Sequence, residues 1–138
     1  MRLAASLRYS VYGLAGVLLA SGALWLVFHY FVIAPQDHAG WTAVAMRVHG
    51  AAAMALLVLA GSAIGLHATS AWRERKNRAS GLVLGAALVI MTITGYLLYY
   101  AGGEAVRSLA SLSHWIAGLA LPGVFAAHAL LGRRSSGC

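Results

Sequence analysis

The sequence predicts an all-α integral membrane protein, an up-down bundle of four transmembrane helices. Of its 138 residues, 61% are hydrophobic and only 9% are charged, and the mean hydropathy is +0.78. A soluble domain has about a quarter of its residues charged, so this chain carries too few charges to solvate a globular surface. The apolar residues form four stretches, at about 9–33, 44–70, 80–100 and 109–131. Each is long enough for the ~20 residues that cross the hydrocarbon core.

Short connections join the four stretches, so successive helices are expected to run antiparallel within a single transmembrane domain covering residues 1–138. Pro35 follows the first stretch and Gly102 and Gly103 follow the third, as residues that stop helices. The first stretch is too long for the apolar region of a cleaved signal peptide, which has about 7–15 residues. It is therefore expected to remain as a transmembrane helix.

The distribution of basic residues predicts the orientation of the chain. Eight of the ten lysines and arginines lie at the N-terminal end, in the connection 71–79 or in the C-terminal tail: Arg2, Arg8, Arg73, Arg75, Lys76, Arg78, Arg133 and Arg134. The other two connections hold only Arg47 and Arg107. The positive-inside rule then places both termini in the cytoplasm. The net charge of +7 is explained by this topology, and nucleic-acid binding is not expected, because the basic residues flank apolar runs rather than lining one face.

Aromatic residues cluster at the predicted outer boundary of the membrane, where such rings commonly anchor helices. They are Trp25, Phe28, Tyr30, Phe31, Trp41, Tyr96, Tyr99, Tyr100 and Trp115, while Trp72 marks the inner boundary.

Four of the six histidines form a regular pattern in the second and fourth stretches. His49 and His67 are 18 residues apart, about five helical turns, and His114 and His128 are 14 apart, about four turns. Each pair is therefore expected on one helix face. Both helices run from outside to inside, so His49 and His114 lie near the outer surface and His67 and His128 near the inner one. Each level then holds one imidazole from each of two helices, as a haem with two axial histidines requires.

His29, at the outer end of the first stretch, competes with His49 as a ligand of the outer haem. His49 is preferred because it shares a helix face with His67. However, the two histidine pairs span ~27 Å and ~21 Å along their helices, a mismatch that helix tilt must absorb. His29 would otherwise bond a haem propionate, line a quinone pocket or lie at the interface.

Other metal sites fit the sequence less well. Zinc prefers three or four ligands at one level, and none of the three acidic residues, Asp37, Glu74 and Glu104, lies inside a stretch. The single cysteine, Cys138, allows no Cys-based cluster, and there is no Cys-x-x-Cys-His motif for covalent haem attachment.

The segment TGYLLYY at 94–100, a short polar loop and the segment HWIAGLALPGVFAAHALLGRR from His114 to Arg134 resemble the four-helix membrane-bound b-type cytochromes. This group includes the cytochrome b subunits of bacterial formate dehydrogenases and hydrogenases, the bacterial cytochrome b561 group and DUF4405-like proteins. The resemblance covers about residues 44–134. It implies two haem b groups, with support strongest for His114 and His128.

The same resemblance implies a place in the bacterial cytoplasmic (inner) membrane and the respiratory chain. Members of the group pass electrons between quinone in the membrane and a periplasmic or membrane redox partner. The chain departs from the pattern in one respect. In several members the first helix donates the inner ligand, whereas here that end carries Tyr9 and Tyr12, which leaves His67 for the inner haem.

These observations give three hypotheses. The first is a di-haem electron-transfer subunit without catalytic residues, since two axial histidines leave the iron no open position. The second is a stand-alone quinol- or superoxide-linked oxidoreductase, with His29, Arg47 and Glu104 as candidates for a quinone pocket. The third is a haem-free membrane assembly subunit in which the histidines bond neighbouring helices.

Overall fold

The computed structural model describes residues 5–31, 35–65, 69–73 and 77–134. These residues form four long helices, α1 (Ala5–Phe31), α2 (Pro35–Ala63), α4 (Arg78–Tyr100) and α5 (Glu104–Arg134), and one short helix, α3 (Thr69–Arg73). The four long helices are long and apolar enough to cross a membrane. The structure therefore confirms an all-α chain with four candidate membrane spans.

The second helix differs most from the expected bounds. It begins at Pro35, where a proline fits the first helical turn because that turn needs no N–H partner. It ends at Ala63, with a wider π-helical turn at residues 64 and 65, whereas the sequence indicated one helix over 44–70. Residues 66–68, including His67, lie outside the described part of the chain, so the proposed shared face of His49 and His67 stays a prediction.

The last helix begins at Glu104, earlier than the expected start at 109. A carboxylate in the first turn of a helix interacts favourably with the helix dipole, which explains why helicity extends back to this residue.

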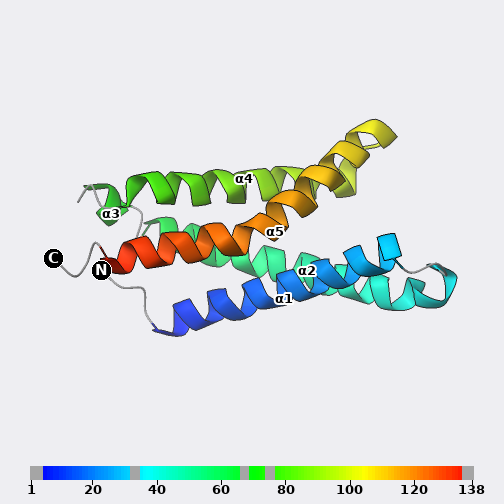
Figure 1. Cartoon of the computed structure of the whole chain (residues 1–138), viewed down its shortest axis with the longest axis horizontal. Helices are drawn as coiled ribbons and strands as arrows, with labels where there is room; N and C mark the ends of the chain where they lie inside the picture. The colour runs from blue at the N-terminus through cyan, green and yellow to red at the C-terminus, as the bar shows by residue number, and fades with distance from the viewer. Residues whose placement is uncertain (1–4, 32–34, 66–68, 74–76, 135–138) are drawn as a thin grey trace. The chain divides into compact units, whose positions relative to one another are not determined.

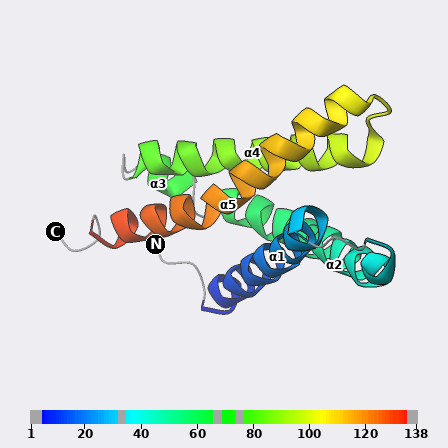
Figure 2. The ribbon, with the colours of Figure 1, turned by 45° about the vertical axis from the view of Figure 1, so that its right-hand side comes forward.

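The chain divides into two compact units, Met1–His67 and Ala68–Cys138. In the first, α1 and α2 lie side by side and antiparallel, and we call this pair hairpin 1 (Figures 1 and 2). In the second, α4 and α5 pair in the same way as hairpin 2. The joined end of each hairpin is where its two helices connect, and the other end is the open end. The up-down arrangement of all four helices stays a prediction.

Small side chains occupy the interface of each hairpin. The buried residues are Ser21, Ala45 and Ala52 in hairpin 1 and Thr94 and Ala110 in hairpin 2. Small residues allow helix backbones to approach closely, which is how membrane helices gain van der Waals contact.

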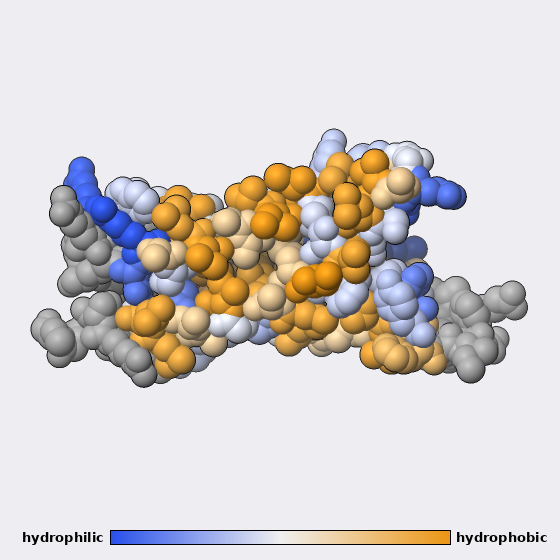
Figure 3. Space-filling view, turned by 45° about the horizontal axis from the view of Figure 1, so that its top comes forward, coloured by the Kyte–Doolittle hydropathy of each residue, from blue (hydrophilic) through white to orange (hydrophobic). Residues whose placement is uncertain are grey.

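Most large apolar side chains point away from these interfaces. In the apolar 18-residue segment of each candidate span, at most 11% of the residues are buried inside the protein. Apolar side chains cover much of the surface between the helix ends (Figure 3). In water such a surface would aggregate, whereas lipid solvates it. The surface thus fits a multi-pass membrane protein.

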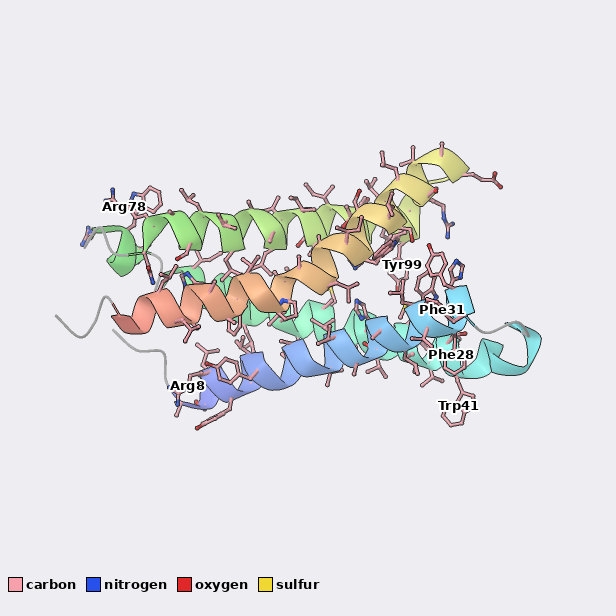
Figure 4. All side chains as sticks on the ribbon, in the orientation of Figure 1. Arg8, Phe28, Phe31, Trp41, Arg78 and Tyr99 are labelled. Carbon is pink, nitrogen blue, oxygen red and sulfur yellow. The ribbon has the colours of Figure 1, made fainter. Side chains whose placement is uncertain are left out.

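Aromatic and basic side chains lie toward the helix ends. Phe28, Phe31 and Trp41 lie near the joined end of hairpin 1, and Arg8 lies at its open end (Figure 4). In hairpin 2, Tyr99 lies near the joined end of α4, as the sequence predicts for an interfacial aromatic residue.

The open end of hairpin 2 also holds a stacked arginine. The Arg78 guanidinium lies 4.9 Å from the centre of the Trp72 ring, and its Nε donates to the Trp72 carbonyl at 3.1 Å. These contacts join α3 to the start of α4.

Pro122 lies inside α5, and the helix changes direction partway along its length (Figure 1). Proline removes the backbone bond to the carbonyl four residues earlier and its ring clashes with that carbonyl, which bends a helix. The helix nevertheless continues to Arg134.

Asn77 precedes α4 in a left-handed conformation, with φ of 54° and ψ of 26°. Its carbonyl accepts hydrogen bonds from the Gly81 N–H at 3.0 Å and the Ser80 hydroxyl at 3.2 Å. Its Nδ2 lies 3.5 Å from the His128 carbonyl, and a Cβ at Gly132 would lie only 3.1 Å from this Nδ2. Asn77 therefore links the start of α4 to the end of α5.

The left-handed backbone at Asn77 predicts a difference between two substitutions that both remove the amide. Asn77→Ala is expected to lower the free energy of unfolding by about 1 kcal/mol more than Asn77→Gly, because only glycine adopts a positive φ without steric cost. Reversible unfolding in mixed micelles measures this difference. Equal stability of the two variants would contradict a positive φ at this position.

Candidate functional site: hydroxyl–imidazole pairs between helices

In hairpin 2, two histidines of α5 face two hydroxyls of α4. The Nδ1 of His114 lies 2.9 Å from the Thr94 hydroxyl, and the Nδ1 of His128 lies 3.0 Å from the Ser80 hydroxyl. The two histidines are 14 residues apart, and so are the two hydroxyl residues. The antiparallel register is therefore the same at both pairs, although Pro122 lies between the histidines. His114 and His128 share the face of α5 that packs on α4, as their spacing predicts.

Hairpin 1 contains the same arrangement. The Nδ1 of His49 on α2 lies 3.0 Å from the Ser21 hydroxyl on α1. In both hairpins, then, the first helix supplies the hydroxyl and the second supplies the imidazole. Ser21 and Thr94 are buried, while His49 and His114 are half-buried.

A glycine follows each hydroxyl residue and lies against the facing imidazole ring. A Cβ at Gly22 would lie 3.3 Å from Cε1 of His49, and a Cβ at Gly95 would lie 3.4 Å from Cε1 of His114. The distance at Gly22 is tighter than ordinary van der Waals contact, and the distance at Gly95 lies at the lower limit of such contact. Glycine at these two positions lets each ring lie close to the backbone of the neighbouring helix.

Sequence reasoning missed the three hydroxyl residues, yet a signal for them is present. A serine or threonine followed by glycine occurs three times within the four spans, at 21–22, 80–81 and 94–95, and each time it faces a histidine. The 14-residue separation of the last two matches the separation of His114 and His128. That equal spacing on two antiparallel helices could have identified both pairs.

His29 lies elsewhere on α1. Its ring is exposed and stacks on Trp25 of the same helix, with centroids 4.5 Å apart and planes 12° apart, and meets the edge of Tyr30. It is eight residues beyond Ser21, about 12 Å along the helix axis. At the position of His49, α1 thus contributes the Ser21 hydroxyl rather than the His29 ring.

The other predicted site residues stay untested. Arg47 and Glu104 are exposed and belong to different hairpins, so a quinone pocket that contains them stays a prediction. The His67 position lies outside the described residues. Within the part of the chain that is described, no three His, Cys, Asp or Glu side chains gather as a zinc site would require. The chemistry of these sites is therefore that of individually held imidazoles.

Held imidazoles of this kind fit axial ligation of haem. A metal-binding histidine commonly uses one ring nitrogen for the metal while the other bonds a protein group that fixes the ring orientation. In His49, His114 and His128 the Nδ1 atom bonds the hydroxyl, so Nε2 is the atom suited to a metal. The indole N–H of Trp115, next to His114, is buried and has no partner among the described residues. A ligand atom that accepts a hydrogen bond would satisfy it.

Comparison with protein-family models, with curated proteins and with solved structures finds no match to this chain.

The Thr94–His114 pair predicts a specific loss of stability. Thr94→Val keeps the shape of the side chain but removes the interhelical hydrogen bond, and should lower the free energy of unfolding by about 0.5–2 kcal/mol. Steric-trapping or detergent unfolding of the full chain measures this change.

Thr92→Val is the matched control, because Thr92 is exposed on the same helix and its hydroxyl bonds only the Leu88 carbonyl of its own helix, at 2.8 Å, in the described structure. Equal effects of the two substitutions would show that the bond to His114 does not contribute to stability.

Proposed function

We propose that this protein is a di-haem b-type cytochrome subunit that carries electrons across the membrane between the quinone pool and a redox partner. His49 and His114 are the proposed ligands of the outer haem iron, and His67 and His128 those of the inner one. The observation that carries the proposal is that three of these four histidines lie half-buried in membrane spans with Nδ1 engaged by a hydroxyl. His67 is included on its sequence spacing.

When bound, the haem supplies reversible one-electron transfer at its iron. The chain contributes positioning and insulation. The hydroxyls of Ser21, Ser80 and Thr94 fix the orientation of the imidazoles, and the apolar spans keep water and ions away from them. Two histidines would hold each haem iron, so the protein would conduct electrons rather than transform a substrate at the metal. Quinone or quinol and a periplasmic or membrane redox protein are the proposed partners.

His49 is favoured over His29 as the outer ligand. The His49 ring is half-buried and held by a neighbouring helix, whereas the His29 ring is exposed and stacks on its own helix. A ligand that is already oriented loses less conformational entropy when it binds a metal.

One observation also favours the haem-free subunit. A hydrogen bond between a hydroxyl and an imidazole joins two membrane helices without any cofactor, and the three pairs would serve this purpose alone. The two functions differ in whether the purified chain carries pigment.

The haem proposal is tested by the reduced-minus-oxidised spectrum and the pyridine haemochrome of the full chain purified in mild detergent. We expect two haem b per chain. His49→Ala and His114→Ala should each remove the same spectral component, and His128→Ala the other one. His29→Ala is the control and should retain both.

A chain purified without b-type absorption, with His114→Ala leaving it unchanged, would contradict the proposal and favour the haem-free assembly subunit.

The proposed location is the bacterial cytoplasmic membrane with both termini inside. Cys138 is the single cysteine and serves as a native label at the C-terminal end. A membrane-impermeant maleimide should modify it only after spheroplasts are permeabilised. In a Cys138→Ser background, Gly102→Cys in the joined end of hairpin 2 should be modified in intact spheroplasts. The reverse pattern of labelling would invert the topology.

A further inference from the structure

We infer that Ser21 and Thr94 are positioning residues that lock His49 and His114 in the tautomer with the proton on Nδ1, independently of any bound group. The consequence for haem binding rests on the function proposed above. The tautomer itself is a property of the polypeptide, so the two can be tested separately.

The direction of the hydroxyl proton carries this inference. A hydroxyl has one proton to donate, and a backbone carbonyl can only accept. The Ser21 hydroxyl lies 2.6 Å from the Val17 carbonyl, and the Thr94 hydroxyl lies 2.7 Å from the Ile90 carbonyl. Each hydroxyl therefore donates its proton to its own helix. The oxygen that faces the imidazole then acts as an acceptor, and Nδ1 must donate.

Burial makes the opposite tautomer costly. Ser21 and Thr94 are each only 8% exposed, so water does not readily replace a lost partner. With the proton on Nε2 instead, the Nδ1 lone pair would face the lone pairs of the hydroxyl oxygen. The hydroxyl could relieve this only by giving up its short bond to the carbonyl. The opposite tautomer therefore loses the hydrogen bond from the buried hydroxyl to the carbonyl, so the Nδ1–H form is favoured.

This tautomer is the one that metal ligation through Nε2 needs. With the proton on Nδ1, the lone pair is on Nε2, and no proton has to be displaced from Nε2 when a metal binds. The hydrogen bond from Nδ1–H to an oxygen also raises the basicity of Nε2 and so strengthens its bond to oxidised iron. The hydroxyls thus set both the orientation and the protonation of the two proposed outer ligands.

The inferred tautomer lock does not include the Ser80–His128 pair, because the hydrogen bond of the Ser80 hydroxyl to its carbonyl is longer. The Ser80 hydroxyl lies 3.2 Å from its carbonyl acceptor, a longer contact than the other two. The inferred lock is therefore restricted to the two sites with short hydroxyl–carbonyl bonds.

The tautomers are measured by nitrogen NMR of the haem-free full chain in lipid nanodiscs, with ¹⁵N-labelled histidine, at a pH where the rings are neutral. We expect His49 and His114 to show a protonated Nδ1 and an unprotonated Nε2. Thr94→Val should convert a large part of the His114 signal to the Nε2–H form and leave His49 unchanged. Thr94→Ser should preserve the wild-type signal, and Thr92→Val is the matched control without effect.

In the haem-loaded chain, Thr94→Val should weaken retention of the outer haem by about 10–100-fold and raise its midpoint potential, with Thr94→Ser restoring both.

If His49 and His114 carry the proton on Nε2 in the wild-type chain, the inference is overturned. This measurement needs no variant, so the test stays decisive even when a substitution prevents folding. A His114 signal that Thr94→Val does not change would overturn it as well. If the chain shows the expected tautomers but binds no haem, the inferred lock is supported and the proposed function is refuted.

Discussion

The hydrogen bond between a hydroxyl on one helix and an imidazole on the next is the interaction on which both hairpins depend. Inside a membrane, water is not present to satisfy polar groups, so a histidine within a span needs a partner from the protein. Ser21 and Thr94 provide that partner at the most buried positions of their helices. The same bond therefore makes a polar side chain tolerable in lipid and fixes the direction of its ring.

Close packing around each pair follows from this bond. A distance near 3 Å between side chains of different helices requires the helices to approach closely, and bulky neighbours would prevent it. Ala45 lies four residues before His49, and Ala110 lies four residues before His114, so each imidazole has a buried alanine one turn away on its own helix. Gly22 and Gly95 admit the rings from the other side. Small residues and hydroxyls thus act together, which explains why these interfaces contain no large buried side chain among the described residues.

Hydropathy alone was sufficient to predict the four candidate spans, because a helix must be long and apolar enough to cross the bilayer. Periodicity was sufficient to predict the shared face of His114 and His128, since α5 stays helical through Pro122. The bounds of the second helix were less predictable. Pro35 suits both the stop of one helix and the start of the next. The end at Ala63 lies inside an apolar run where Gly61 and Gly65 do not differ in kind from the glycines inside the other helices.

The hydroxyl partners could not be predicted from single residues. Serine and threonine in membrane helices commonly bond the carbonyl four residues earlier, as Ser62 and Thr92 do and as Ser21 and Thr94 also do. The glycine that follows Ser21 and Thr94 indicates a close approach of another helix, but it does not indicate which residue faces the hydroxyl. What distinguishes them is a residue on another helix, at a position set by the antiparallel register. That information exists in the sequence only as a relation between two segments.

In each described pair, the histidine bonds a hydroxyl on the other helix of its own hairpin. This arrangement affects the order in which the pairs form during synthesis. A pair of antiparallel spans can enter the membrane together during synthesis, before later spans have left the ribosome. His49 would then acquire its partner as soon as α2 is inserted, without waiting for α4 or α5. Each described imidazole is therefore oriented within its own half of the chain.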